Sequence, residues 1–527
     1  MSRRLVPALV LVGLLAAGGA AVAAGKSEAP AGGGAAAAES KDAEAAAAPA
    51  EGSGVAAEAD TAAAPAASET SEGGGLFEQS TAAASSEAAA SGQPALALGG
   101  YVRGDAYVGK VMDDRQADLK AGYGELALVA RTSKTPYGDG FAETRLRYGL
   151  QGDLHQTFLD VREAYVNAYL GPVDLRVGKQ IVVWGRADIL NPTNNLTPND
   201  LRIRSPIEDD RRIGNVGARA FVRLSPLRFE AVWLPSYVAS ELPPVSLPRY
   251  VYFGAPKYPS PGLKTWTEAA RVHLEMPSFE MSVSYLYGYA PLPGLTLRDI
   301  VFDKYDPQVL IARTAYKHQV VGFDFSTALG DILGIRGEAA YRRPFKYDDL
   351  DYRNLVNTPS PDLQYALGFD HNFGSVMVIV QYLGRYAFDW EKKEDPAMEL
   401  DPDSLRVDRY ALDEATYDGQ KEQYGNIVNT MLARFSQMLF NQTERIQHLA
   451  TARVEWTTLH DTLSLSAIGM VNFSTREWLA APKIGYRISD SMTAYVGAEV
   501  LTGPSGTLFG LVDETLSAGY AELRSTF

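Results

Sequence analysis

Strand-like segments follow one another from residue 96 to the end of the chain, and the connections between them sort by length. Each segment has about ten to fifteen residues, is rich in Tyr, Val, Leu, Phe, Thr and Gly, and is bounded by turn residues. Short turns such as "GPVD", "SP" and "LGD" follow the even-numbered segments, whereas long loops follow most odd-numbered ones. Short turns on one rim and long loops on the other are typical of a transmembrane antiparallel β-barrel, whereas a soluble sandwich or propeller has no reason to sort its loops in this way.

The segments predict an all-β fold, a closed barrel of about 18 strands, which is an even number wide enough to leave a lumen. The predicted strands span residues 96–109, 121–134, 139–150, 155–170, 173–184, 215–224, 227–236, 265–275, 279–291, 316–328, 332–343, 361–371, 375–389, 446–458, 461–473, 476–487, 491–501 and 515–527. The predicted long loops span residues 110–120, 185–214, 237–264, 292–315, 344–360, 390–445 and 502–514. Two odd-numbered connections, near Asp153 and Thr475, are short and fit the pattern less well.

The N-terminal residues predict export. Arg3 and Arg4 precede an apolar stretch, and Ala21-Val22-Ala23 offers a small-residue cleavage site, so residues 1–24 are interpreted as a signal peptide rather than an uncleaved anchor helix. Residues 25–92 are rich in Ala, Gly, Ser and Glu, and such a segment buries too little apolar surface to order itself. We therefore expect a disordered periplasmic tail, either a solvated spacer or a tether to a periplasmic partner, ahead of a barrel domain at 93–527.

Composition excludes several classes of function. The chain has no Cys, so it has no disulfide, no thiol chemistry and no lipid-modified N-terminal Cys. The net charge is −15, and residues 26–92 carry 11 acidic residues against Lys26 and Lys41, so over half of the negative charge lies in the tail. The rest of the chain is still acidic and has no basic stripe, which disfavours nucleic-acid binding. We expect no cofactor and no metal.

Aromatic residues occupy the positions that a membrane barrel predicts for them. The chain ends in a strand-like segment whose last residue is Phe527, and bacterial outer-membrane barrels commonly end on such a strand. We expect this strand to close the barrel and to be recognised by the barrel-assembly machinery, with outer-membrane lipid as the main partner. Interfacial girdles are predicted from Trp184, Trp233, Trp266, Trp390 and Trp478 near the long-loop ends and from Trp456 near the short-turn end. The alternative is that these are core residues of a soluble β protein.

The loop at 185–213 combines charge, proline and asparagine directly after a predicted strand. Its charges have both signs: Arg186, Asp188, Asp200, Arg202, Arg204, Asp209, Asp210, Arg211 and Arg212. Pro192, Pro198 and Pro206 prevent regular strand pairing nearby. Non-regular backbone at membrane depth is tolerated where it lines a water-filled cavity or is buried in protein. We therefore consider three roles for it: a lumenal constriction, packing over the rim, or a dedicated ligand site.

The same region resembles a family. The segment "REAYVNAYLGPVDLRVGKQIVVWGRAD" from Arg162 to Asp188, followed by Asn191-Pro192 and by "LTPNDLR" from Leu196 to Arg202, is similar to the signature of a group of porin-like bacterial outer-membrane proteins. That group carries an L-R-x-G-[RK]-Q-x-x-x-W-G segment and then an N-P/P-x-D loop. The resemblance covers about 40 residues plus the terminal aromatic strand. It implies an outer-membrane barrel and implies no substrate.

The longest predicted loop, 390–445, contains a helical pattern. Apolar residues recur at helical spacing: Tyr424, Ile427, Val428, Met431, Leu432, Phe435, Met438 and Leu439. They predict an amphipathic helix of about five turns, either packed against the other loops or acting as a lid or plug. The acidic run "ELDPDSLRVDRYALDEATYDG" lacks the ligand spacing of a calcium loop, so it is interpreted as solvated surface, with loose divalent-cation bridging as the alternative.

Three functions remain open. The first is a conduit across a Gram-negative outer membrane for small solutes or for an exported polymer such as a polysaccharide. The second is a structural anchor for an envelope-spanning machine. The third is a hydrolase, which the six scattered histidines support poorly, because none lies in a catalytic motif, although His155 and Asp153 share a predicted outer loop. The chain is therefore expected not to be an enzyme.

Overall fold

The computed structural model describes most of the chain after residue 94. The described ranges are residues 95–110, 117–151, 154–200, 202–241, 250–260, 262, 265–330, 332–345, 355–394, 400–407, 412–504 and 507–527. The predicted signal peptide and periplasmic tail lie outside them. Among the described helices, none combines the length and the apolar character that crossing a membrane requires.

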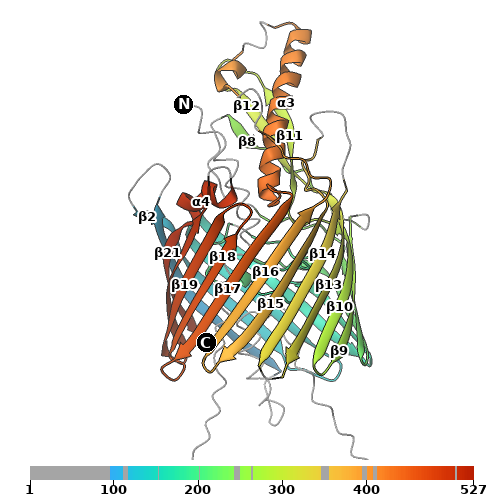
Figure 1. The fold of residues 1–527 in the computed structure, drawn as a ribbon, viewed down its shortest axis with the longest axis vertical. Coiled ribbons are helices and arrows are strands. Elements are labelled where there is room, and N and C mark those ends of the chain that lie inside the picture. Colours follow the sequence, from blue (N-terminus) through green and yellow to red (C-terminus); the bar gives the residue numbers. More distant parts are fainter. Residues whose placement is uncertain are drawn as a thin grey trace, which may run out of the picture.

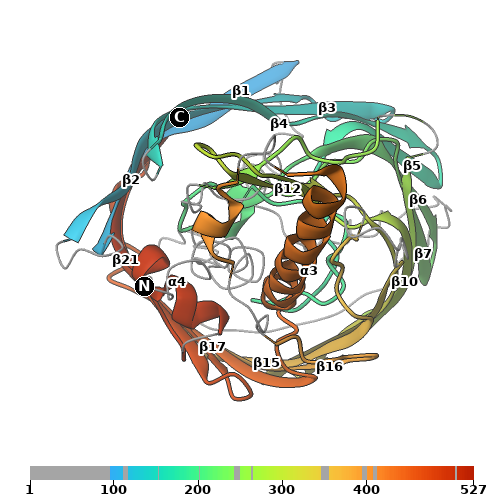
Figure 2. The same ribbon diagram turned by 90° about the horizontal axis from the view of Figure 1, so that it is seen from above.

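Eighteen strands form one sheet that closes on itself, in the order in which they occur in the chain (Figures 1 and 2). They are β1 (Leu96–Lys110), β2 (Ala117–Thr132), β3 (Gly138–Gln151), β4 (Leu154–Leu170), β5 (Val173–Gln180), β6 (Asn215–Leu224), β7 (Leu227–Leu234), β9 (Thr267–Met276), β10 (Phe279–Tyr289), β13 (Lys317–Leu329), β14 (Leu333–Pro344), β15 (Asp362–Phe373), β16 (Val376–Ala387), β17 (Ile446–Thr458), β18 (Leu463–Asn472), β19 (Glu477–Ser489), β20 (Met492–Thr502) and β21 (Ala518–Thr526). Neighbouring strands are antiparallel, and β21 pairs with β1 to close the ring.

The predicted barrel is therefore confirmed, and each predicted strand overlaps the barrel strand of the same rank. The prediction succeeded because a strand and its turns are encoded locally. The clearest error is at the fifth strand, which was predicted to reach Trp184 and ends at Gln180.

Side chains along the strands alternate in the opposite sense to those of a soluble β protein, with apolar residues facing outward and charged residues facing inward. In β1, Val102 and Val108 are half exposed on the outer face, while Arg103 and Asp105 between them are almost fully buried on the inner face. The same alternation recurs in β3, where Leu146 is exposed on the outside and Arg145 is buried. An apolar outer surface around a polar interior suits lipid outside and a polar lumen inside. A closed sheet also satisfies every backbone group without water. The chain is thus a multi-pass barrel of the outer membrane.

The two rims differ as the sequence predicts. Two-residue turns such as 171–172, 225–226 and 277–278 join strands at the lower rim of Figure 1. The long connections rise from the opposite rim, which by the usual orientation of such barrels is the outer one.

Long outer connections fold together into a small compact unit, which we call the crown. It contains the three-stranded sheet of β8 (Val251–Phe253), β11 (Gly294–Val301) and β12 (Gln308–Thr314), together with the helix α3 (Glu414–Leu439), which stands above the barrel in Figure 1. Buried apolar residues of α3, among them Leu432 and Phe435, share one core cluster with Leu297 of β11 and Ile311 of β12. The predicted helix is confirmed and is packed into the crown. The three short strands were missed, because β8 and β12 pair between two different loops.

The described residues contain three shorter helices. The helix α4 (Leu508–Leu516) lies in the last outer connection, and its Leu508 and Phe509 belong to the same apolar cluster as Leu479 of β19 and Leu501 of β20. Two 3-10 helices, η3 (Glu208–Arg211) and η4 (Pro402–Leu405), lie in the loops that follow β5 and β16. The helix α4 was not predicted; only its place in the predicted loop 502–514 was.

The tryptophans divide into two groups. Trp233, Trp266, Trp456 and Trp478 are all partly exposed at the ends of their strands, and their position at the membrane interface stays a prediction. Trp184 is only 2% exposed and donates from Nε1 to Glu230 Oε1 at 3.0 Å, so it lies inside the barrel and its assignment to the girdle was wrong. Trp390 donates from Nε1 to the carbonyl of Gln442 at 2.7 Å and is half-buried in the outer connections.

The closing seam brings the C-terminal residue against Gly100 of β1. Gly100 N donates to the Phe527 carbonyl at 2.9 Å, and Phe527 N donates to the Gly100 carbonyl at 3.0 Å. A Cβ atom added at Gly100 would lie 2.9 Å from Phe527 Cζ and closer still to the carbonyl oxygen of Ala127. The strand needs glycine here because both its neighbours approach this position closely.

We therefore expect Gly100→Val to impair barrel closure. The fraction of protein with heat-modifiable migration on a gel should fall severalfold, because overlap with backbone atoms cannot be relieved by a side-chain rotation. Gly104→Val is the matched control, since nothing lies within 4 Å of a Cβ atom added at that position of the same strand. Equal folding yields for the two variants would contradict the expectation.

Candidate functional site

The candidate site is the connection between β5 and β6, residues 181–214, which we call the lumen loop. It contains the predicted charged segment 185–213 and starts four residues earlier because β5 is short. Its residues Val182, Trp184 and Leu196 are buried in a cluster with inward-facing residues of the barrel wall, among them Val232 and Leu286. The lumen loop thus lies against the inner wall rather than over the rim.

One end of the lumen loop is bonded to a row of arginines on the first strands. Asp210 pairs with Arg103 of β1 at 2.5 Å and with Arg145 of β3 at 2.7 Å. Arg162 of β4 donates from Nη2 to the carbonyl of Asp209 at 2.6 Å. We call Arg103, Arg145 and Arg162 the arginine wall. The hydroxyl of Ser205 also donates to Asp210, at 2.5 Å.

The charge state of Asp210 follows from this surrounding. Burial acts to raise the pKa of Asp210, but the guanidinium groups of Arg103 and Arg145 outweigh it and hold the pKa well below its usual value. Asp210 is therefore ionised at neutral pH. A buried charge pair of this kind is costly to break from one side, because the remaining partner keeps its desolvation penalty.

The other half of the lumen loop is bonded to a row of carboxylates about half-way round the ring. Arg186 pairs with Asp324 of β13 at 2.8 Å and with Glu280 of β10 at 2.6 Å. Glu338 of β14 accepts hydrogen bonds from the lumen loop as well. We call Glu280, Asp324 and Glu338 the acidic wall. Asp188 extends these contacts to Arg453 of β17, at 2.8 Å.

The lumen loop therefore joins arginines on one part of the inner wall to carboxylates on another, and these wall groups also pair with neighbours such as Glu125, Glu143 and Arg271. Loop acceptors meet the arginine wall, and loop donors meet the acidic wall. The walls belong to strands far apart in the ring, since β1 to β4 and β10 to β14 are separated by several strands on either side. Seen down the barrel in Figure 2, loop segments and the elements of the crown project inside the outline of the ring.

The remaining predicted charges pair within or beside the lumen loop. Arg202 pairs with Asp200 at 2.7 Å, and Arg212 pairs with Asp209 at 2.6 Å. Arg204 donates from Nη2 to the carbonyl of Leu516 in α4 at 2.9 Å, which ties the loop to the last outer connection. Arg211 donates from Nη2 to the Ser205 carbonyl at 3.1 Å. The structure thus gives every predicted loop charge a partner, but it separates Arg186 and Asp188 from the others.

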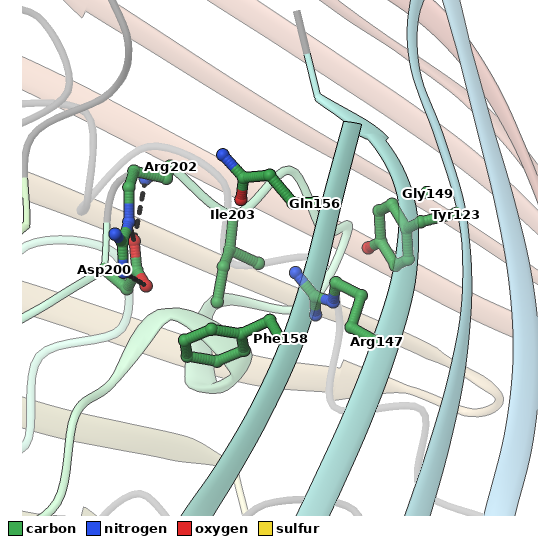
Figure 3. Close-up of a pocket in the computed structure, with 8 residues that line it drawn as sticks. All are labelled: Tyr123, Arg147, Gly149, Gln156, Phe158, Asp200, Arg202 and Ile203. Atoms are coloured by element: carbon green, nitrogen blue, oxygen red, sulfur yellow. Dashed lines mark hydrogen bonds and ion pairs between the residues drawn. The ribbon is translucent and has the colours of Figure 1, made fainter. Parts of the chain in front are cut away.

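A small cavity lies where the lumen loop meets the wall formed by β2, β3 and β4 (Figure 3). It is lined by Tyr123, Arg147, Gly149, Gln156, Phe158, Asp200, Arg202 and Ile203. The side chain of Arg202 remains about a third exposed, so it is among the loop charges that water can reach. Charge from the loop and an aromatic ring from the wall therefore line the same small space.

Other predicted constellations do not assemble into a site. Among the described residues, no group of three or more His, Asp or Glu side chains is placed to hold a metal ion. Asp413, from the acidic run, caps α3 by accepting from Thr416 N at 3.0 Å, and Asp401 caps η4 in the same way. Glu399 and residues 408–411 of that run lie outside the described residues, as does Asp153, which shares a predicted loop with His155.

Sequence reasoning missed the partners of the loop on the barrel wall. The arginine wall and the acidic wall are built from single charged residues inside strands, at the alternate positions that face inward. The stretch "YVRGDAYV" around Arg103 carries such a signal, because charge alternates there with apolar residues. Which inward charge meets which loop charge depends on contacts across the lumen.

Comparison with known proteins gives a family and a set of distant structures. A family model described as "Protein of unknown function (DUF1302)" matches residues 8–394. No curated protein matches. Similar solved structures include the BenF-like porin from Pseudomonas fluorescens Pf-5, at 12% identity and TM-score 0.45, covering 82% of this chain and 97% of that one. Another is OccAB3 from Acinetobacter baumannii, at 10% identity and TM-score 0.46, covering 82% and 99%. Structural similarity at TM-scores this low carries no information about what this barrel transports.

Proposed function

The chain belongs to the DUF1302 family, and from that premise we propose that it is a conduit for small solutes across the outer membrane, narrowed by its lumen loop. The conduit is the barrel itself, whose polar interior could hold water. The lumen loop would set the width of the passage, and its charges would set the selectivity.

The observation that carries this proposal is the pairing of one loop with opposite walls. Asp210 is bonded to the arginine wall and Arg186 to the acidic wall, so the loop divides the lumen into narrower routes. A narrowed lumen favours small solutes over an extruded polymer. A loop that served only to cover the rim would have no need of partners on both sides of the interior.

Single-channel recording in planar bilayers tests the proposal. We expect a steady ionic current, and we expect Arg202→Glu to shift the permeability ratio toward cations. Arg202 is among the partly exposed loop charges, and a two-unit change of charge about 10 Å from a passing ion is worth roughly 0.8 kcal/mol in water, which corresponds to a two- to fourfold change after screening.

Lys393→Glu is the control, because Lys393 is exposed in the outer connection after β16 and pairs with Glu391 there. It should leave the permeability ratio unchanged. A folded barrel that passes no current would overturn the proposal and would favour the structural anchor instead. Co-purification with periplasmic proteins through residues 25–92 would then be the next observation to seek.

A further inference from the structure

Residues 184–193 of the lumen loop fold around a single carboxylate on the barrel wall. The two oxygens of Glu338 accept from the backbone N–H groups of Arg186, Ala187 and Thr193 and from the Thr193 hydroxyl, the last at 3.0 Å. Glu338 is only 3% exposed. All four donors belong to the loop, so the carboxylate and the loop segment satisfy each other's hydrogen-bonding groups.

The residue types of this segment suit that arrangement. Gly185 has a φ of +119°, and a Cβ atom there would lie 2.9 Å from Glu338 Oε1 and 3.0 Å from Asn191 Cγ. Glycine is thus required for both the backbone conformation and the close approach. Pro192 fixes the turn that returns the chain so that Thr193 meets the same carboxylate as Arg186.

A second set of contacts holds the same segment from the neighbouring strands. The Arg186 side chain pairs with Asp324 and Glu280, and Arg336 of β14 donates to the Arg186 carbonyl at 3.3 Å. These bonds fix the direction in which the loop leaves β5. They do not replace Glu338, because they leave the N–H groups of Ala187 and Thr193 without an acceptor.

We infer that Glu338 is the positioning residue of the constriction. The "WGRAD" and "NPT" residues of the lumen loop, 184–188 and 191–193, serve to hold the loop on its carboxylate. A carboxylate offers two oxygens that accept, and four donors converge on them from one loop. Glutamine has the same shape but offers one oxygen and one amide group that only donates. The inference rests on the proposed function only in treating the lumen loop as a constriction.

Loop position can be measured directly, because the chain has no native Cys. Spin labels would be placed on Asn194→Cys in the lumen loop and Ser375→Cys in the exposed turn between β15 and β16. We expect one narrow distance distribution in the parent protein. In Glu338→Gln and in Gly185→Ala we expect loss of that single peak and a broad distribution, with heat-modifiable migration retained.

Asp362→Asn is the matched control. Asp362 is an equally buried carboxylate on the adjacent strand β15, and its bonds go to Arg342, Arg385 and Gln442 rather than to the lumen loop. It should keep the narrow peak even if it lowers stability. A parent-like peak in both Glu338→Gln and Gly185→Ala would overturn the inference. If the peaks behave as expected but the barrel passes no current, the proposed function fails and the role of Glu338 stands.

Discussion

Replacing Asp210 by Ala is expected to destabilise the barrel by about 3 kcal/mol, the lower end of the range for breaking a buried ion pair, because the guanidinium groups of Arg103 and Arg145 lose their shared partner but keep Glu125 and Glu143. It should also raise the single-channel conductance, since the lumen loop loses both of its ion pairs to the arginine wall and keeps the bond from Arg162 to the Asp209 carbonyl. Equilibrium unfolding in urea measures the first effect, and planar-bilayer recording measures the second.

Asp209→Ala is the neighbouring control. Asp209 is about a fifth exposed and pairs through its side chain with Arg212, so its loss removes one partly buried ion pair rather than two buried ones and should cost clearly less than the loss of Asp210. Equal effects of the two substitutions would show that the arginine wall does not hold the loop.

The pH dependence of the barrel's stability follows from the lowered pKa of Asp210. A carboxyl group whose pKa falls on folding contributes stability that is fully present above its unfolded value, about 3.9, and is lost as the pH falls through the folded value. The stability difference between the parent protein and Asp210→Ala should therefore be constant from about pH 5 upward and should shrink only in strong acid.

Replacing Val496 by Arg is expected to cost about 2–4 kcal/mol in a bilayer, the range for a cation on the lipid face near the membrane midplane. Val496 lies near the middle of β20 and is 58% exposed on the outer face. The cost arises because the guanidinium group would have to leave water for hydrocarbon. Unfolding from lipid vesicles measures it.

Tyr305→Arg is the control for exposure alone. Tyr305 is even more exposed, at 80%, but it lies between β11 and β12 in the crown, beyond the barrel wall. The same cation there should change stability by about 0.5 kcal/mol or less. If Val496→Arg were equally well tolerated, the outer face of the barrel would not be facing lipid.

Much of the barrel could be predicted from local sequence, whereas little of the site could. The strand 446–458 was predicted with the bounds that β17 has, because period-two alternation and flanking turns are properties of neighbouring residues. The charged loop was also found, from its prolines and its mixture of charges. Its partners were not, because Arg103 and Asp210 are 107 residues apart and meet only across the lumen.

Trp184 is a single residue that illustrates the same limit of prediction from local sequence patterns. Its sequence context, at the end of an alternating strand, is that of a girdle tryptophan. The chain leaves the sheet at Gln180, however, and turns the indole inward to Glu230. That turn depends on the contacts the loop makes with distant strands, which no local pattern records.

The amino-acid sequence by itself determined the closed ring, the order of its strands and the difference between its rims, because each of these follows from alternation and turns within short segments. The tertiary structure alone decided where the lumen loop lies, which wall charges hold it, and how three separate loops combine into the crown. These depend on which side chains meet after closure, and closure brings together residues that the chain keeps far apart.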